Sequence, residues 1–126
     1  MILRPGAIIS SGNIVLDILV RPVGEIAWGV TQWVETMDQH LGGNAANTSG
    51  AIASLGVPAR ILGAVGPDGF GESCLARLET MGVNTAFLTR VAEPTASSVA
   101  LVQASGARTF LHRPGASRVA FQNGGP

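Results

Sequence analysis

The sequence contains no lysine, only one cysteine, and few charged residues, which make up 13% of its 126 positions. A lone cysteine, Cys74, cannot form an internal disulfide, so we expect a reducing compartment and a cytoplasmic protein. Eight basic residues balance eight acidic ones, giving a formal net charge of zero. This balance excludes the electrostatic footprint expected of a protein that binds nucleic acid or an anionic membrane.

Long uninterrupted apolar runs are also missing. The N-terminal apolar stretch is broken by Asn13 and Asp17, and no small-residue cleavage site follows it. We therefore expect neither a signal peptide nor a transmembrane helix. Hydrophobic residues nevertheless reach 46%, which excludes a disordered chain, and the length predicts one domain over residues 1–126. Cys74 falls in a helical pattern and is expected to be a small buried hydrophobe.

Strands and helices are predicted to alternate along the chain. Two stretches have helical spacing, and each ends at a glycine, which is typical of a helix C-terminus. Short apolar runs between them predict buried strands of a sheet. The alternation indicates an α/β fold with a parallel sheet. The predicted strands are Ala7–Ser10, Ile14–Val20, Ile61–Val65 and Phe87-Leu88, and the helices are Ala45–Leu55 and Glu72–Met81.

Two further β regions break this alternation. Ile26, Trp28 and Val30 alternate within residues 24–34, which suggests a strand with one apolar face. Residues 95–112 contain Ser97–Val102 and Arg108–Leu111 on either side of a Ser-Gly turn, which predicts a hairpin. We expect these segments to form a small β layer that stands off the main sheet.

The sharpest local feature is Gly42-Gly43-Asn44-Ala45-Ala46-Asn47 at the start of the first predicted helix. Paired glycines let a ligand approach the backbone, and a helix N-terminus offers free N–H donors. Asn47 can donate and accept hydrogen bonds at once, which suits a neutral polyhydroxylated ligand. The alternative is an ordinary helix start with Asn44 as its N-cap. Asp68 is similarly read as a helix-capping or loop residue, and His40 and His112 have no metal-ligand spacing.

The run from Gly42 to Ser49, followed by Gly56 and Gly66, resembles the first signature of the ribokinase-like (phosphofructokinase-B) carbohydrate kinases. Gly12-Asn13 followed by Asp17 is similar to the first strand of that family. Residues 63–71 and 95–116 continue the likeness, so it covers nearly the whole chain. The resemblance implies the N-terminal part of a three-layer sandwich with a small β-sheet lid.

The resemblance also implies a site. Asp17, Gly42, Gly43 and Asn47 would bind the hydroxyls of a sugar or related alcohol, with Asn13 a weaker candidate. A carboxylate in an apolar strand is costly unless it is hydrogen-bonded, and a sugar diol would satisfy Asp17. The alternative for Asp17 is a structural carboxylate bonded to backbone N–H groups near Gly12.

Full-length members of the family would use ATP and Mg²⁺ through later motifs, including a Gly-Ala-Gly-Asp sequence that carries the catalytic base. Those motifs are absent here, so we assign no catalytic or metal residue and expect the chain alone not to phosphorylate a sugar. The expected function is substrate binding within an ATP-dependent sugar kinase. Alternatives are a non-catalytic sugar-binding or dimerisation module and a less favoured dinucleotide-binding oxidoreductase fragment. The resemblance also implies a possible homodimer through the β lid.

Overall fold

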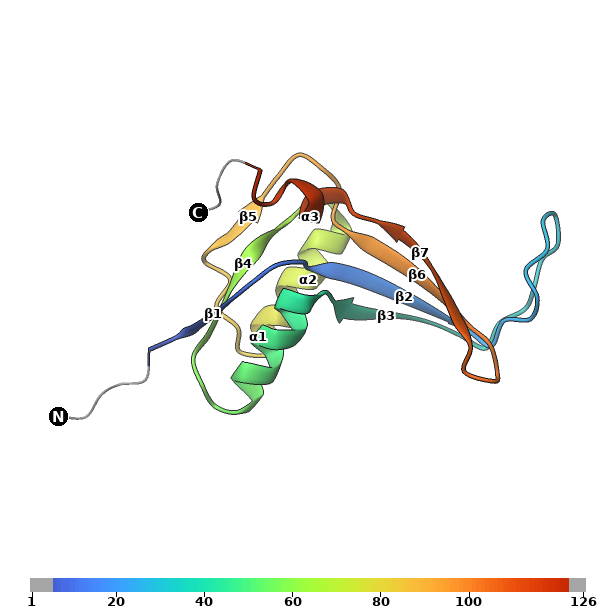
Figure 1. Cartoon of the computed structure of the whole chain (residues 1–126), viewed down its shortest axis with the longest axis horizontal. Helices are drawn as coiled ribbons and strands as arrows, with labels where there is room; N and C mark the ends of the chain where they lie inside the picture. The colour runs from blue at the N-terminus through green and yellow to red at the C-terminus, as the bar shows by residue number, and fades with distance from the viewer. Residues whose placement is uncertain (1–5, 123–126) are drawn as a thin grey trace.

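The computed structural model describes residues 6–122, which form two β-sheets and three helices (Figure 1). No helix in this range is long and apolar enough to cross a membrane. The strands are β1 (Ile8–Ser11), β2 (Val15–Arg21), β3 (Thr36–Gly42), β4 (Ala59–Val65), β5 (Leu88–Arg90), β6 (Ser97–Val102) and β7 (Arg108–Arg113). The helices are α1 (Asn44–Ser54), α2 (Gly69–Thr80) and α3 (Gly115–Val119).

The first sheet is parallel and has the strand order β1-β4-β5. Helix α1 packs on β1 and β4, and α3 also contacts β4. Ile61 and Val65 of β4 are buried in one core cluster with Ala46 of α1 and Leu78 of α2. Parallel strands with helices packed against them confirm the predicted α/β class.

Both long helices end as their sequences predict. Helix α1 is followed by Gly56 with φ 77°, and α2 by Gly82 with φ 85°. A left-handed residue after the last turn lets nearby N–H groups reach the final carbonyls, and glycine adopts that backbone without steric cost. Small residues let α1 pack closely: a Cβ placed on its buried Gly50 would overlap the terminal methyl of Met81.

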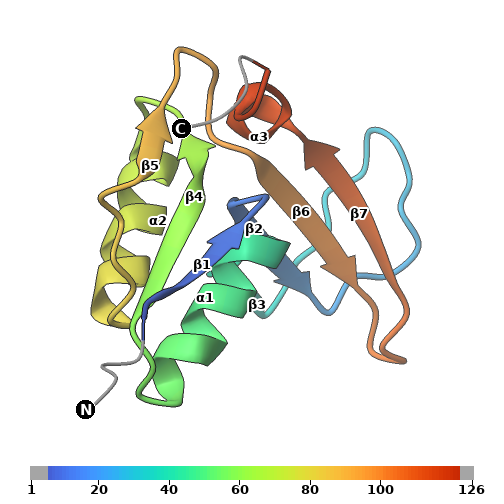
Figure 2. The ribbon, with the colours of Figure 1, turned by 60° about the vertical axis from the view of Figure 1, so that its left-hand side comes forward.

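The second sheet has the strand order β3-β2-β6-β7. It extends away from the helices in Figure 1, and Figure 2 shows the β6–β7 hairpin leaning away from β4, β5 and α2. Strand β2 is antiparallel to β3 and parallel to β6, so it lies in the interior of this sheet. The chain therefore leaves the first sheet after β1 and enters the second at β2, although both segments have similar apolar sequences.

The hairpin prediction is confirmed, because β6 and β7 pair antiparallel with Val102 opposite Arg108. These two strands also lie in a different sheet from β4, as expected. The predicted strand within residues 24–34 is wrong: this segment is a loop, and Ile26 and Trp28 are 56% and 100% exposed. Alternation of apolar residues indicates a strand only where one face is buried, and nothing buries this one.

Strand β3 takes the place expected for that segment, and the sequence did not indicate it. Its residues TMDQHLG are mostly polar and exposed, so they carry no apolar alternation. Pairing along the whole of β2, from Val15 opposite Gly42 to Arg21 opposite Thr36, holds it in the sheet. A short helix, α3, was also not predicted, and its Ala116 is fully buried with its N–H donating to the Pro94 carbonyl at 2.7 Å.

Candidate functional site

The junction between β3 and α1 is built on two glycines that leave no room for a side chain. Gly42 ends β3, and a Cβ placed on it would overlap the carboxylate of Asp17. Gly43 has φ 92°, and a Cβ there would overlap the carbonyl oxygen of Asn13. Residues other than glycine rarely adopt this backbone. The close approach of β2 to the start of α1 therefore requires both glycines.

Asn44 fastens the same junction through its side chain. Its Oδ1 accepts a hydrogen bond from the backbone N–H of Asn13 at 2.7 Å and another from Ala45 at 2.9 Å. The N-cap is Gly43, with Asn44 the first helical residue, so the alternative role of Asn44 as the cap is wrong. The backbone of Asn13 is thus held in place, because its carbonyl also accepts from the Ala45 N–H at 3.2 Å.

Asp17 lies half-buried in the middle of β2, with its carboxylate against Gly42. The structure gives this carboxylate no hydrogen-bond donor among residues 6–122. The backbone N–H of Gly12 donates instead to Leu62 at 3.1 Å, so the alternative of a structural Asp17 bonded near Gly12 is not observed. A partly buried carboxylate without a protein donor has its acceptor capacity available for a ligand.

Asn47 lies one turn into α1, and its side chain is exposed. Its backbone N–H donates to the Gly43 carbonyl at 2.9 Å. The first turn of α1 contains no acidic residue, and Gly43 offers no side chain to cap it. The N–H groups of Ala45 and Asn47 have protein acceptors, but no carboxylate in the first turn offsets the positive end of the helix, which therefore favours a nearby ligand oxygen.

The structure thus gathers the five predicted residues around one junction. Asp17 contacts Gly42, and Gly43 contacts Asn13. The backbone N–H of Asn47 donates a hydrogen bond to the carbonyl of Gly43. Their role in binding a sugar stays a prediction.

Three further polar residues share the sheet face of Asp17, and sequence reasoning did not place them there. His40 of β3 is directly opposite Asp17, Ser98 of β6 is beside it, and His112 of β7 is opposite Ser98. Paired residues of neighbouring strands project to the same face of a sheet. The Oγ of Ser98 and the Nδ1 of His112 are hydrogen-bonded at 2.8 Å. Only the strand register reveals this row, and the sequence does not specify that register.

A second polar network ties α2 to the base of the second sheet. Asp68 is the N-cap of α2, as expected, and its Oδ1 accepts from the Gly71 N–H at 2.9 Å. The same carboxylate accepts from the hydroxyl of Thr95 at 2.6 Å and from its N–H at 3.0 Å. Burial favours a higher pKa for Asp68, but the hydrogen bonds from Thr95 and Gly71 and the charge of Arg113 outweigh it and lower the pKa.

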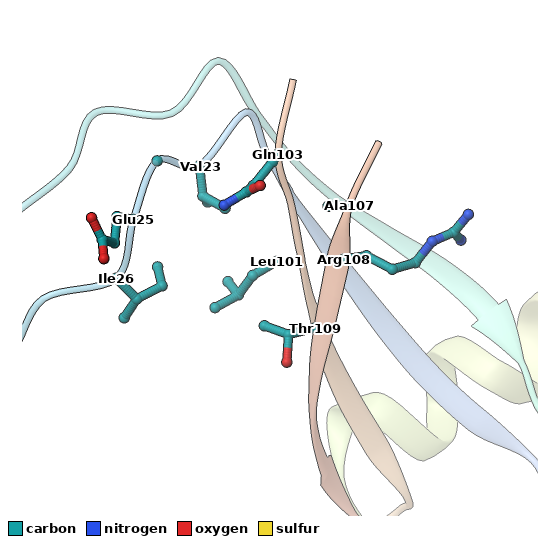
Figure 3. Close-up of a pocket in the computed structure, with 9 residues that line it drawn as sticks. Val23, Glu25, Ile26, Leu101, Gln103, Ala107, Arg108 and Thr109 are labelled. Carbon is teal, nitrogen blue, oxygen red and sulfur yellow. The ribbon is translucent and has the colours of Figure 1, made fainter. Parts of the chain in front are cut away.

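A cavity of about 230 Å³ lies between the loop after β2 and the β6–β7 hairpin (Figure 3). Leu101 and Thr109 are paired across the hairpin and line it, together with Val23 and Ile26 of the loop. Leu101 is three residues from Ser98, and successive side chains of a strand point to opposite faces. The cavity is therefore on the face of the sheet opposite to Asp17.

The prediction for Cys74 has a clear structural outcome. Cys74 is fully buried in the core, as predicted, and burial raises the pKa of its thiol to about 11. His40 and His112 lie at opposite edges of the second sheet, and no group of three or more His, Cys, Asp or Glu among residues 6–122 could hold a metal ion.

Comparison with known proteins assigns the chain to a family. A profile described as pfkB family carbohydrate kinase matches residues 10–123, most of the chain. The chain belongs to the pfkB family of carbohydrate kinases. The family that the Gly42–Ser49 signature suggested is thereby confirmed.

Solved structures of the family superimpose well on this chain. Ribokinase from Arabidopsis thaliana, solved with ribose and ATP, is 26% identical over 87% of the chain with a TM-score of 0.80. Ribokinase from Giardia lamblia is 25% identical over 87% with a TM-score of 0.80. Fructokinase from Xylella fastidiosa is 27% identical over 88% with a TM-score of 0.73. The chain covers 36%, 36% and 34% of these structures, so it spans about a third of their length.

Proposed function

We propose that this chain is the substrate-binding portion of an ATP-dependent sugar kinase and that it does not transfer phosphate on its own. The observation that carries the proposal is the Asp17 carboxylate, half-buried against Gly42 and without a protein donor at the start of α1. Membership of the pfkB family supports phosphorylation of a sugar as the reaction of the whole protein. The geometry around Asp17 supports hydrogen bonding to sugar hydroxyls as the part played by this chain.

The residues of the junction have complementary roles toward a polyol. The Asp17 carboxylate only accepts hydrogen bonds, so it would hold two adjacent hydroxyl groups as donors. The Asn47 amide both donates and accepts, and would hold a third hydroxyl on the helix side. Gly42 and Gly43 let a sugar ring approach the backbone, because no Cβ intervenes. These contacts fix a sugar in place, which is the positioning contribution that phosphoryl transfer requires.

The described residues do not fit a magnesium–ATP site. They contain no group of three or more potential metal-ligating side chains, and the whole sequence contains no lysine to hold a phosphate. Phosphoryl transfer depends on electrostatic stabilisation of the transferred group, and removing one such donor already costs on the order of a hundredfold in rate.

Equilibrium binding tests this function. Because the Arabidopsis relative was solved with ribose and another relative is a fructokinase, D-ribose and D-fructose are the first probes. Saturation-transfer NMR should detect binding of at least one of them, and should detect no binding of Mg-ATP. Incubation with ATP, magnesium and either sugar should release no sugar-dependent ADP. Sugar-dependent turnover by the purified chain would contradict the assignment, and failure to bind any sugar would contradict the binding role.

We also propose that the chain forms a homodimer through the second sheet. Exposed apolar side chains gather on and beyond this sheet, including Met37 on β3, Leu111 on β7 and Trp33 in the loop between β2 and β3. Met37 is opposite Val20, and Leu111 is opposite Val99, so both project to the face away from Asp17. Exposed apolar surface of this kind is typical of an interface. Sedimentation equilibrium should show a dimer, and a Met37→Glu, Leu111→Glu chain should be a monomer; a monomeric parent chain would contradict the proposal.

A further inference from the structure

The row of polar residues across the second sheet extends the proposed sugar site beyond Asp17. Its members come from all four strands: His40, Asp17, Ser98 and His112, in the order β3-β2-β6-β7. Neighbouring strands are about 4.8 Å apart, so Asp17 and His112 are separated by roughly 10 Å at the backbone. Ser98 is the small side chain between them. A ligand held by Asp17 would therefore lie over Ser98 and end near His112.

The bond between Ser98 and His112 fixes the direction of the imidazole. Ser98 is buried, at 8% exposure, whereas His112 is exposed. Its Oγ is 2.8 Å from Nδ1, which leaves Nε2 as the ring nitrogen available to a ligand. When Ser98 donates to Nδ1, the neutral ring carries its proton on Nε2, and the protonated ring carries one there as well. Both forms present Nε2–H as a donor.

The two ends of the row are thus chemically opposite. Asp17 accepts hydrogen bonds from hydroxyl groups, whereas His112, when Ser98 donates to its Nδ1, donates one through Nε2–H. We propose that His112 is a specificity-determining residue that selects sugars or polyols with an acceptor oxygen, a carboxylate or a carbonyl, at the end remote from Asp17. Ser98 is its positioning residue. This inference rests on the proposed sugar-binding function and adds a preference within that site.

Three matched ligands test the preference on the full chain. D-gluconate ends in a carboxylate, D-gluconamide in a neutral carbonyl, and 1-deoxy-D-glucitol in a methyl group, which accepts no hydrogen bond. One hydrogen bond contributes about 0.5–1.5 kcal/mol, so the two acceptor-bearing ligands should bind about two- to tenfold more tightly than 1-deoxy-D-glucitol. Stronger binding of gluconate alone would identify a carboxylate, and similar binding of gluconate and gluconamide a carbonyl oxygen; equal binding of all three would overturn the proposal.

Variants of His112, His40 and Ser98 test which residue causes the preference for acceptor-bearing ligands. His112→Phe should make the three dissociation constants equal by weakening the two acceptor-bearing ligands to the level of 1-deoxy-D-glucitol. His40→Phe, at the other end of the row, should preserve the preference. If His112→Phe fails to fold, Ser98→Ala provides the second test: it should reduce the preference and change the ¹⁵N shifts of the His112 ring, and Ser98→Thr should restore both. A preference that survives His112→Phe, or Ser98→Ala with unchanged ring shifts, would overturn the proposal.

The outcomes distinguish the proposed preference of His112 from the sugar-binding function on which it rests. If Asp17→Asn weakens all three ligands equally while the His112 variants change nothing, sugar binding stands and the preference is refuted. If D-ribose or D-fructose binds but none of the three ligands does, sugar binding stands and the preference is refuted. If none of the five ligands binds, both proposals fail.

Discussion

Removing the Asp68 carboxylate should destabilise the chain more than any other single charge removal on α2. One side chain accepts three hydrogen bonds there, from Gly71 at the helix start and from the N–H and hydroxyl of Thr95. Thr95 is fully buried, so its donors would not be rehydrated freely in an Asp68→Ala chain. Loss of the cap costs about 1 kcal/mol, and leaving buried donors without an acceptor costs about 1–3 kcal/mol more. We expect a loss of about 2–4 kcal/mol in unfolding free energy.

Urea unfolding followed by far-UV circular dichroism is the appropriate assay. Tryptophan fluorescence is a poor probe because Trp28 and Trp33 are 100% and 95% exposed in the folded chain. Glu79→Ala is the matched control: Glu79 is on the same helix and accepts one exposed hydrogen bond from Thr85 at 3.2 Å. The control should change the unfolding free energy by less than about 0.5 kcal/mol. If Asp68→Ala cost no more than Glu79→Ala, the network would not hold α2 to the second sheet.

The same carboxylate predicts a pH dependence with a definite sign. The pKa of Asp68 is lowered in the folded chain, so the ionised carboxylate is more stable relative to the protonated form in the folded state than in the unfolded state. The stabilisation is complete above the unfolded value of about 3.9 and is lost as the pH falls through the lower folded pKa. The difference in stability between the parent chain and Asp68→Asn should therefore shrink below about pH 4. A difference that grew on acidification would refute the reasoning.

Three further outcomes are expected. Gly43→Ala should destabilise the chain by at least about 1 kcal/mol in urea unfolding, because it meets both a left-handed backbone and the Asn13 carbonyl; an unchanged midpoint would contradict the tight junction. Cys74 should not react with a thiol reagent at pH 8 until the chain unfolds, because it is buried with a pKa of about 11; rapid native labelling would contradict this. Acrylamide should quench Trp28 and Trp33 fluorescence nearly as well in folded as in unfolded monomer, and protection at low protein concentration would contradict their exposure.

Sequence reasoning succeeded where a local signal was also a structural requirement. The Gly42-Gly43 pair predicted a backbone open to close approach at the start of α1, and in the structure the neighbours that approach are Asp17 at Gly42 and Asn13 at Gly43. Gly56 and Gly82 ended two helices for a reason that depends only on backbone conformation. Buried β4 and the β6–β7 hairpin likewise carried their own apolar and turn patterns.

It failed where the structure depends on pairing partners rather than on local pattern. Strand β3 is polar and exposed along most of its length, and it is a strand because its backbone pairs with β2. The loop at 24–34 has the apolar alternation of a strand, but no neighbouring strand pairs with it. Trp28 is therefore exposed to solvent. The association of Asp17 with Ser98 and His112 depends on the register of three strands, and a slip of one residue would place them on opposite faces.

The central claim is that Asp17 binds the sugar, and one comparison of dissociation constants tests it most directly. Asp17→Asn keeps the size of the side chain and removes its charge, and Asp38→Asn makes the same change at an exposed position on β3 of the same sheet. A hydrogen bond to a charged group contributes about 1.5–3 kcal/mol, so the dissociation constant for D-ribose or D-fructose, whichever binds, should rise at least about tenfold in Asp17→Asn. Asp38→Asn should leave it unchanged. Equal affinities of the two variants, with both still folded, would contradict the proposed site.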